Sequence, residues 1–403
     1  MHIRCIQCGA TYDLHQRLLA CTKCGDLLEI VVEARQSPDE LKALWRERRL
    51  SNDPRDLSGV WRFREFLPAG YERVITMGEG NCPLVAAQRS GEWAGLRHLR
   101  YKHLGWNPTG CFKDLGMTVG VTEALAAGAE IVACASTGNT SGSMAAYAAR
   151  AGMKARVYLP AGMVSLAKVA QSIDYGAELV EIAGNFDDAL ETMLSTGDRG
   201  VYFLNSINPF RIEGQKTVIF ELMTQLDWQP PDYIVCPGGN LGNSSAFGKA
   251  LEEMKAHGLI EKVPRLIVVQ AAGANPLARL WRRGGGELEP VTDPETVATA
   301  IRIGNPRSWK KAMRVLKFSQ GMVLDVTDEE IGDAKEMIGR DGIGCEPASA
   351  TTLAGLRKLV AERRIEPDAS VVAILTGHVL KDPAYIIERH HYVAKGAAGT
   401  GAH

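Results

Sequence analysis

The sequence predicts an α/β protein with parallel sheets, preceded by a small cysteine-rich ribbon. From about Leu99 onward, short β-rich runs alternate with Ala-rich helical runs, which is the pattern of parallel strands joined by covering helices. Two Cys-x-x-Cys pairs stand near the N-terminus. The 403 residues, 45% of them hydrophobic, suffice to bury the cores of two or three domains.

Charge and hydropathy exclude several classes of partner. Lys and Arg number 46 against 47 Asp and Glu, so the net charge of -1 gives no electrostatic reason to expect nucleic acid or an anionic membrane surface. No apolar run approaches the length of a membrane span, and the first residues lack the apolar core of a signal peptide. We therefore expect a cytoplasmic protein without nucleic-acid or membrane partners, whose nine cysteines stay reduced.

Two pairs of cysteines predict a zinc-ribbon-like segment over residues 1–33. Cys5 and Cys8 form the first pair. Cys21 and Cys24 form the second, and a Gly that tolerates a tight turn follows each pair. Four thiolates in a tetrahedron suit a structural Zn²⁺, which supplies folding energy that so short a segment lacks. The alternatives are a ribbon that has lost its metal or binds iron, and a nucleic-acid or protein-docking module. The segment is not markedly basic, which favours a structural or docking role.

The rest of the chain divides into candidate strands and helices. A polar stretch over 37–56 contains a short helix and a turn. Strands are expected at 131–135, 155–159, 179–182, 233–236, 266–270 and 371–375. Helices are expected at 143–151, 166–176 and 186–195. Because the active sites of parallel sheets lie beyond the C-terminal ends of the strands, the loops after these strands are the places to look.

A polar loop follows the strand expected at 131–135. It consists of Ser136, Thr137, Gly138, Asn139 and Thr140 and leads into an Ala-rich helix. Hydroxyls, an amide and backbone N–H groups at a helix N-terminus bind a carboxylate or phosphate. A simple N-cap is the alternative, but one such residue would be enough for a cap. We therefore favour a ligand site.

A glycine-rich loop follows the strand expected at 233–236. The segment PGGNLGN spans residues 237–243 and precedes another helix. Its glycines let backbone amides approach an anion without obstruction. The loop lacks the Lys-Ser/Thr pair of a nucleotide P-loop, so it suits the phosphate of a permanently held cofactor. A turn without a ligand is the alternative.

A lone lysine, Lys113, stands in NPTGCFKDLGMT at 107–118, where a loop becomes an apolar helix. A cation is disfavoured at the positive end of a helix dipole, so this position needs a reason. Pyridoxal phosphate requires a lysine, a phosphate-binding loop and a partner for its pyridine nitrogen. Thr376 offers that partner at the end of the strand expected at 371–375. These three features together predict a pyridoxal-phosphate enzyme.

The motifs resemble those of a known family when they are taken in order. The chain is similar to the threonine synthases, most of all to their plant-type branch, within the fold type II (tryptophan synthase β-like) pyridoxal-phosphate enzymes. The segments that carry the resemblance are GEGNCPL (78–84), NPTGCFKDLGMT (107–118), ASTGNTSGS (135–143), NSINPFRIEGQKT (205–217), PGGNLGN (237–243) and LTGHVLKDP (375–383). Cys111 and Cys82 stand where Ser and Thr are usual in the family, and neither change removes a reacting group.

The resemblance implies a role for each residue of these motifs. Lys113 would attach the cofactor covalently, Asn139 would contact its 3′-oxygen, and Thr376 would bond its pyridine nitrogen. The residues that would hold the cofactor phosphate are Gly239, Asn240, Leu241, Gly242 and Asn243. The residues that would bind the substrate carboxylate are Ser136, Thr137 and Thr140.

The activity implied by the resemblance is the conversion of O-phospho-L-homoserine and water to L-threonine and phosphate, by γ-elimination of phosphate and β-addition of water. The leaving phosphate needs a cation, and Arg211 is the best candidate because a guanidinium binds phosphate oxygens in a forked geometry. A salt bridge is the alternative role for Arg211. Weaker candidates for contact with the phosphate are Asn205, Asn208 and Lys216.

The sequence leaves alternative functions open and predicts a division into domains. The same scaffold supports replacement of the phosphate of O-phosphoserine, as in cysteate synthases, and threonine or serine dehydration. A non-enzymatic docking protein is the third possibility, against which the intact lysine and loops argue. We expect a large cofactor-binding domain at 34–119 and 216–403, a small mobile domain at 120–215, and a homodimer.

Overall fold

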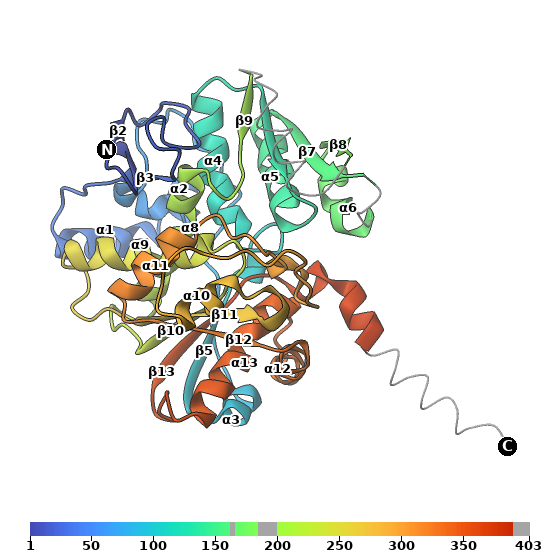
Figure 1. The fold of residues 1–403 in the computed structure, drawn as a ribbon. Helices are drawn as coiled ribbons and strands as arrows, with labels where there is room; N and C mark the ends of the chain where they lie inside the picture. Colours follow the sequence, from blue (N-terminus) through green and yellow to red (C-terminus); the bar gives the residue numbers. More distant parts are fainter. Residues whose placement is uncertain (162–165, 184–199, 390–403) are drawn as a thin grey trace.

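The computed structural model describes residues 1–161, 166–183 and 200–389. Within these residues the chain forms three sheets: a small one near the N-terminus, one of six strands and one of four (Figure 1). The helix predicted over 186–195 lies outside the described residues. Every strand predicted from the sequence is present, within one residue at either end.

The largest sheet forms the lower part of the molecule in Figure 1. Its strands are β4 (Leu84–Ala86), β5 (His98–His103), β10 (Tyr233–Pro237), β11 (Arg265–Ala271), β12 (Met322–Val326) and β13 (Ser370–Leu375). The strand order is β12-β11-β10-β13-β5-β4, and only the pair β4–β5 is antiparallel. The middle strands are almost continuously buried, as expected for strands covered on both faces.

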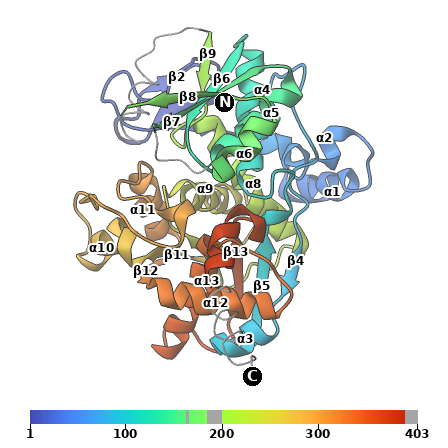
Figure 2. The same ribbon diagram turned by 90° about the vertical axis from the view of Figure 1, so that its right-hand side faces the viewer.

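Two layers of helices cover this sheet. The helices are α3 (Arg89–Ala94), α8 (Pro209–Gln225), α9 (Gly242–Ala256), α10 (Pro276–Arg282), α11 (Trp309–Phe318), α12 (Asp328–Arg340) and α13 (Pro347–Ala361). Helices α3, α12 and α13 pack together in one layer (Figure 2), and α8, α9 and α11 pack in another. Each layer has its own apolar core, so both faces of the sheet are buried away from solvent.

A smaller sheet lies above the large one in both views. Its strands are β6 (Ile131–Ala135), β7 (Lys154–Pro160), β8 (Glu178–Ile182) and β9 (Val201–Phe203), all parallel in the order β8-β7-β6-β9. The accompanying helices are α4 (Lys113–Ala126), α5 (Asn139–Ala151) and α6 (Leu166–Asp174). Helix α5 begins four residues earlier than predicted, because the polar loop itself forms its first turn.

The N-terminal segment forms an antiparallel ribbon and a short helical region. The strands are β1 (His2–Cys5), β2 (Thr11–Tyr12) and β3 (Leu28–Val31), in the order β2-β1-β3. Helices α1 (Pro38–Arg48) and α2 (Pro54–Leu57) follow. Helix α1 starts with a capping box between Ser37 and Glu40, and its Trp45 is 1% exposed. Short 3₁₀ helices occur at η1 (Trp61–Phe66), η2 (Leu104–Trp106), η3 (Ala272–Ala274), η4 (Thr299–Ile301) and η5 (Val379–Lys381).

Basic side chains of α9 and α11 attach the ribbon to the rest of the protein. Lys249 of α9 and Lys311 of α11 donate from Nζ to backbone carbonyl oxygens of β3, each over 2.5 Å. Arg314 pairs with Glu29 of the same strand at 2.9 Å. At its other side, the ribbon contacts α4 through His15 and the buried Glu123 carboxylate, 3.1 Å apart. The ribbon is therefore built into the fold rather than tethered to it.

Helices α4 and α8 cross at glycines, and this crossing places the start of α4. A Cβ at Gly214 of α8 would lie 1.8 Å from the Leu115 carbonyl oxygen. A Cβ at Gly116 of α4 would lie 3.0 Å from the Arg211 carbonyl oxygen. Only glycine permits backbones to approach this closely. Lys113, two residues before Leu115, is thereby held against α8.

The six-stranded and four-stranded sheets fall on either side of the predicted domain division. The predicted boundary at 215/216 lies inside α8, which packs against both α4 and α9. Nothing else in the fold fixes a boundary, so the domain limits stay a prediction. Among the residues that the structure describes, no helix has the length and apolar character needed to cross a membrane.

Candidate active site

Lys113 is the first residue of α4, and its Nζ lies 4.0 Å from the centre of the Phe112 ring. Burial lowers the pKa of the Lys113 amine to about 7, and the positive charge of Arg211 acts in the same direction. An amine that is partly neutral near pH 7 is both a nucleophile and a base. The side chain therefore suits covalent attachment of an aldehyde and subsequent proton transfer.

A buried carboxyl group joins two residues that the sequence assigned to the cofactor. Glu346, at the start of α13, is 3% exposed. One of its oxygens accepts a hydrogen bond from Asn139 Nδ2 over 2.9 Å, and the other accepts from Thr376 Oγ1 over 2.9 Å. Burial raises the pKa of Glu346, against the pull of Lys113. The structure thus gathers Lys113, Asn139 and Thr376 around one carboxyl group.

Thr376 is fixed further by Ser349 of α13. Ser349 Oγ accepts the Thr376 N–H over 2.8 Å and the Gly377 N–H over 3.3 Å. The two hydroxyl oxygens of Ser349 and Thr376 lie 3.0 Å apart. The Thr376 hydroxyl therefore has a defined position at the end of β13, as a partner for a cofactor ring requires.

The start of α5 has free backbone donors. Its N-cap residue is Gly138, and no side chain forms a capping hydrogen bond there. Ser136 Oγ accepts only from the Gly138 N–H, over 3.3 Å, and Ser136, Thr137 and Thr140 are all half-buried. The N-cap alternative raised by the sequence is thus not realised. An uncapped helix start lined with hydroxyls suits a carboxylate.

Asp114 connects the lysine loop to α5. Its carboxylate accepts from the Thr109 N–H over 2.7 Å, from Thr109 Oγ1 over 2.6 Å and from Ser143 Oγ over 2.5 Å. Burial raises the pKa of Asp114 to about 6. These three bonds hold the loop that precedes Lys113 against the helix that follows β6.

The glycine-rich loop runs from the end of β10 to the start of α9. A Cβ at Gly238 would lie 2.6 Å from Val268 Cγ1, so the loop backbone packs too closely for a side chain. Leu241 has a φ of 64° and no side chain caps α9. The Asn243 Oδ1 atom is buried without a partner among the described residues. The uncapped helix start fits the anionic arm of pyridoxal phosphate, whereas the unmatched Asn243 oxygen is an acceptor and gives no support for an anion.

Asn240 and Gly239 of this loop have different surroundings. The Asn240 side chain donates to Ser206 Oγ over 2.7 Å and accepts from the Arg307 N–H over 2.7 Å. Asn240 therefore ties the loop to its neighbours. A Cβ at Gly239 would lie 3.1 Å from Ile301 Cγ2, so this glycine also marks a close approach.

Arg211 is a buried cation for which the described residues provide no counter-ion. It is 1% exposed, and its Nη1 donates to the Leu204 carbonyl oxygen over 2.9 Å. Among the described residues its Nε has no hydrogen-bond partner, and no carboxylate forms an ion pair with it. Burial lowers the pKa of Arg211 to about 10. The salt-bridge alternative is therefore not realised, and an unpaired buried guanidinium calls for an anion.

The weaker candidates near Arg211 already have protein partners. Asn205 exchanges two hydrogen bonds with the backbone of Ala135, over 3.1 and 3.3 Å. Asn208 caps α8 by accepting the Phe210 N–H over 3.0 Å. Lys216 lies between the carboxylates of Glu213 and Glu253 at 2.6 and 2.7 Å. A substrate contact by the two Asn residues stays a prediction, whereas the charge of Lys216 is already neutralised.

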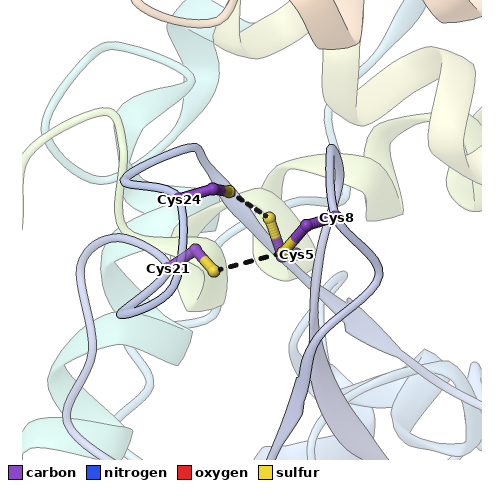
Figure 3. Close-up of side chains that lie close together, drawn as sticks. All are labelled: Cys5, Cys8, Cys21 and Cys24. Atoms are coloured by element: carbon purple, nitrogen blue, oxygen red, sulfur yellow. Dashed lines mark hydrogen bonds between the residues drawn. The ribbon is translucent and has the colours of Figure 1, made fainter.

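The four ribbon cysteines converge on one point, as Figure 3 shows. Their Sγ atoms all lie within 4.8 Å of one another, with Cys5–Cys24 and Cys8–Cys21 at 3.5 Å. Tetrahedral Zn²⁺ with Zn–S bonds of about 2.3 Å sets its sulfur atoms about 3.8 Å apart. The Tyr12 hydroxyl, 3.0 Å from Cys21 Sγ, lowers the pKa of that thiol to about 6. The cluster fits the predicted structural zinc.

The sequence reasoning missed three residues at the site. Glu346 lies between α12 and α13 in the segment GCEPASATT, and an acidic residue directly before a helix-starting Pro was its available signal. Lys381 extends along Gly110, with its Cε 3.3 Å from a Cβ built there, and bonds Gln171 Oε1 over 2.5 Å. Gln171 of α6 also donates to the Thr109 carbonyl oxygen over 3.2 Å. No local pattern marks this contact between α6 and η5.

Comparison with known proteins agrees with this geometry. Residues 75–377 match the family described as pyridoxal-phosphate dependent enzyme. The threonine synthase of Methanocaldococcus jannaschii is 46% identical over 383 residues, 94% of this chain and 93% of that protein. The threonine synthase of Mycobacterium leprae is 45% identical over 326 residues, 80% of this chain and 88% of that protein.

Solved structures share the fold at lower identity. A fungal L-serine ammonia-lyase from Rhizomucor miehei superposes with a TM-score of 0.67 and 22% identity, covering 79% of this chain and 99% of that one. The serine racemase of maize superposes with a TM-score of 0.62 and 20% identity, covering 78% of this chain and 94% of that one. These structures confirm the predicted fold type II architecture.

The matches to the family and to the curated relatives span most of the chain and include the segment that carries Lys113. The chain therefore belongs to the threonine synthases, within the family of pyridoxal-phosphate-dependent enzymes.

Proposed function

We propose that this protein converts O-phospho-L-homoserine and water to L-threonine and phosphate, as a carbon–oxygen lyase. The strongest structural support is Arg211, a buried guanidinium that has no counter-ion within the described part of the chain and acts electrostatically on the Lys113 amine. A site that only dehydrated threonine or serine would need no binding group for a substrate phosphate. The named activity of relatives at 46% identity supports the same reaction.

Pyridoxal phosphate is the cofactor that the site residues fit. Lys113 would attach it, Asn139 would contact its 3′-oxygen and Thr376 would contact its ring nitrogen. The amides of residues 239–243 would bind its phosphate at the start of α9. When bound, this cofactor delocalises the negative charge that develops on the substrate carbons. All other steps belong to side chains of the protein.

Lys113 moves the protons of the reaction. Once released from the cofactor, its amine takes the proton from the substrate Cα and then acts at Cβ. A pKa of about 7 leaves a large fraction of the amine neutral near pH 7, as a general base requires. Its place at the start of α4, fixed by the glycine crossing, holds Nζ at the reacting carbons.

The carboxylate and the phosphate of the substrate bind at different helices, α5 and α8. Ser136, Thr137 and Thr140 hold the carboxylate at the uncapped start of α5. Arg211 holds the phosphate through its unpaired Nε, because the N–H groups of a guanidinium donate charge-assisted hydrogen bonds to phosphate oxygens. Asn205 and Asn208 shape the segment that carries Arg211. A water molecule adds at Cβ after the phosphate leaves.

We also propose that residues 120–215 form a small domain that closes over the large one. Its support is that Asn139–Glu346 and Gln171–Lys381 bonds join segments from both sides of the site. Closure excludes bulk water from the reacting carbons, apart from the water molecule that adds at Cβ. We propose in addition that the protein is a homodimer, which light scattering tests. We also propose that it resides in the cytoplasm, for which the nine cysteines without a disulfide are support.

The decisive experiment is turnover by the cofactor-loaded protein. Incubation with O-phospho-L-homoserine should release threonine and phosphate in equal amounts. Lys113→Ala should abolish release, and Arg211→Met should lower kcat/KM for this substrate. Parallel assays with O-phosphoserine, threonine and serine test phosphate replacement and dehydration. Turnover of those substrates alone, or none in the loaded protein, would contradict the proposal.

A further inference from the structure

Gln215 of α8 carries a buried amide group that bonds to no described residue. The residue is 4% exposed, and its side chain makes no hydrogen bond within the described part of the chain. An amide that leaves water without gaining a hydrogen bond destabilises the folded protein. Such a group needs an explanation, and a ligand that it contacts is one.

This amide is adjacent to the starts of two helices. A Cβ at Gly116, in the first turn of α4, would lie 2.9 Å from Gln215 Nε2. A Cβ at Gly242, the first residue of α9, would lie 3.7 Å from Gln215 Oε1. Glycine at both positions leaves room for the amide. Gln215 therefore lies beside the uncapped start of α9, where the glycine-rich loop ends.

Arg211 and Gln215 lie four residues apart in α8 and so share one face of the helix. The stem of Arg211 follows α4 away from Gln215, because its Cβ lies 3.3 Å from a Cβ at Gly116 and its Cγ lies 3.3 Å from a Cβ at Gly120. Its Nη1 then donates to the Leu204 carbonyl oxygen. One face of α8 thus presents a cation along α4 and a neutral amide at the start of α9, which can serve two different anions.

Gln215 offers the start of α9 a donor without a charge. Lys216, the next residue, is already neutralised by Glu213 and Glu253 at 2.6 and 2.7 Å. An amide NH₂ group has two donors, and no hydrogen bond among the described residues fixes the orientation of this one. It can therefore turn toward an anion that the helix dipole and backbone amides attract.

We propose that Gln215 binds the phosphate of the cofactor, as a side-chain donor that supplements the backbone amides of the glycine-rich loop. The inference rests on the proposed function, in which that loop holds the phosphate of pyridoxal phosphate. It assigns Gln215 to cofactor retention and leaves the phosphate of the substrate to Arg211.

This contact ties the cofactor to the helix pair that places Lys113. Gly214, directly before Gln215, is the point at which α8 meets the Leu115 carbonyl oxygen of α4. A phosphate bonded to Gln215 is therefore fixed relative to the start of α4. Lys113 and the phosphate site hold opposite ends of the cofactor, so the crossing of α4 and α8 sets the distance between these two points.

The test compares pyridoxal phosphate with pyridoxal, which has the same aldehyde but no phosphate. Both react with the Lys113 amine, so the ratio of their dissociation constants isolates the contribution of the phosphate. Gln215→Met removes the amide donors at similar side-chain length. Gln229→Met makes the same substitution at an exposed residue beyond the end of α8. Absorbance titration of the cofactor-free proteins measures all four quantities that matter, namely both ligands with each variant.

The expected result is a loss of affinity confined to the phosphorylated ligand. Gln215→Met should weaken binding of pyridoxal phosphate about 10- to 100-fold, the effect of losing one hydrogen bond to a charged group, and leave pyridoxal unchanged. The ³¹P NMR signal of the bound cofactor should shift as well. Gln229→Met should match wild type with both ligands. An equal loss for both ligands would show that Gln215 only supports the packing of α8, and it would overturn the inference.

The wild-type protein tests the proposed function separately. If it binds both aldehydes equally, the glycine-rich loop holds no phosphate and the proposed cofactor site is wrong. If it prefers pyridoxal phosphate and Gln215→Met keeps the full preference, only the assignment of Gln215 fails. A raised KM for O-phospho-L-homoserine at unchanged cofactor affinity would move Gln215 to the substrate phosphate and also overturn the inference. Should Gln215→Met not fold, Gln215→Asn decides in the same way, because it keeps an amide but withdraws it by one carbon.

Discussion

Replacing Gly214 of α8 by Ala tests how the fold places the catalytic lysine. The new Cβ would lie 1.8 Å from the Leu115 carbonyl oxygen and 3.1 Å from Gly116 Cα. A carbon–oxygen contact needs about 3.3 Å, so α8 and α4 must separate by about 1.5 Å. The obstacle is backbone, which cannot rotate aside as a side chain can. The start of α4, with Lys113, moves along with it.

The expected cost has two parts. Overpacking of this kind costs about 1–3 kcal/mol. Ala is about 1 kcal/mol more favourable than Gly in a helix interior. An overpacking cost of about 3 kcal/mol therefore leaves a net loss of stability of about 2 kcal/mol. Displacement of a catalytic group by about 1 Å lowers the rate on the order of 100-fold. Stability and activity should therefore fall together.

Urea unfolding and steady-state kinetics on the loaded enzyme measure both parts. Gly339→Ala is the matched control, because Gly339 lies in α12 and a Cβ there meets nothing within 4 Å. We expect this control to be up to about 1 kcal/mol more stable than wild type, with unchanged kcat. If Gly214→Ala behaved like Gly339→Ala, the α4–α8 crossing would not position Lys113.

Three other predictions concern the site and the ribbon. Covalent capture of pyridoxal phosphate by the cofactor-free protein should speed up as pH rises through about 7 and then level off, because the lowered pKa of Lys113 makes its amine neutral there. Stopped-flow absorbance measures this, and a rate still climbing toward pH about 10, as for an exposed lysine, would contradict it. Arg211→Lys keeps the charge but loses the fork, so kcat/KM for the phosphorylated substrate should fall about 10- to 100-fold at unchanged cofactor occupancy. An unchanged kcat/KM would remove Arg211 from phosphate binding. Cys24→Ser should lose one equivalent of zinc and lower the thermal midpoint, since β3 links the ribbon to Lys249 and Lys311. Metal analysis and calorimetry check this, and retained zinc would show that Cys24 is not a ligand.

Local patterns predicted much of the fold and of the cofactor site. The apolar runs at 233–236 and 371–375 identified central strands, because strands buried on both faces must be apolar throughout. The glycine loop at 237–243 and the polar loop at 136–140 were recognisable because helix starts that bind anions need small or polar residues. Lys113 stood out because its charge is unfavourable where α4 begins.

Contacts between distant residues escaped the same reasoning. Glu346 is 207 residues from Asn139 in the chain, and nothing near either residue indicates the other. The lack of a counter-ion for Arg211 depends on every element packed around it, as does the pairing of Lys216 with Glu253. The antiparallel pairing of the edge strand β4 with β5 depends on the path of the chain between them, and the three residues of β4 do not indicate it.

The sequence by itself determined the strands, the loops that follow them, the lysine and the cysteine cluster, because each depends on the polarity and backbone freedom of consecutive residues. Only the tertiary structure decided which charges are paired and which carboxyl group lies behind Thr376. Those properties depend on the order of strands and the crossing of helices, which bring together side chains that no local interaction connects.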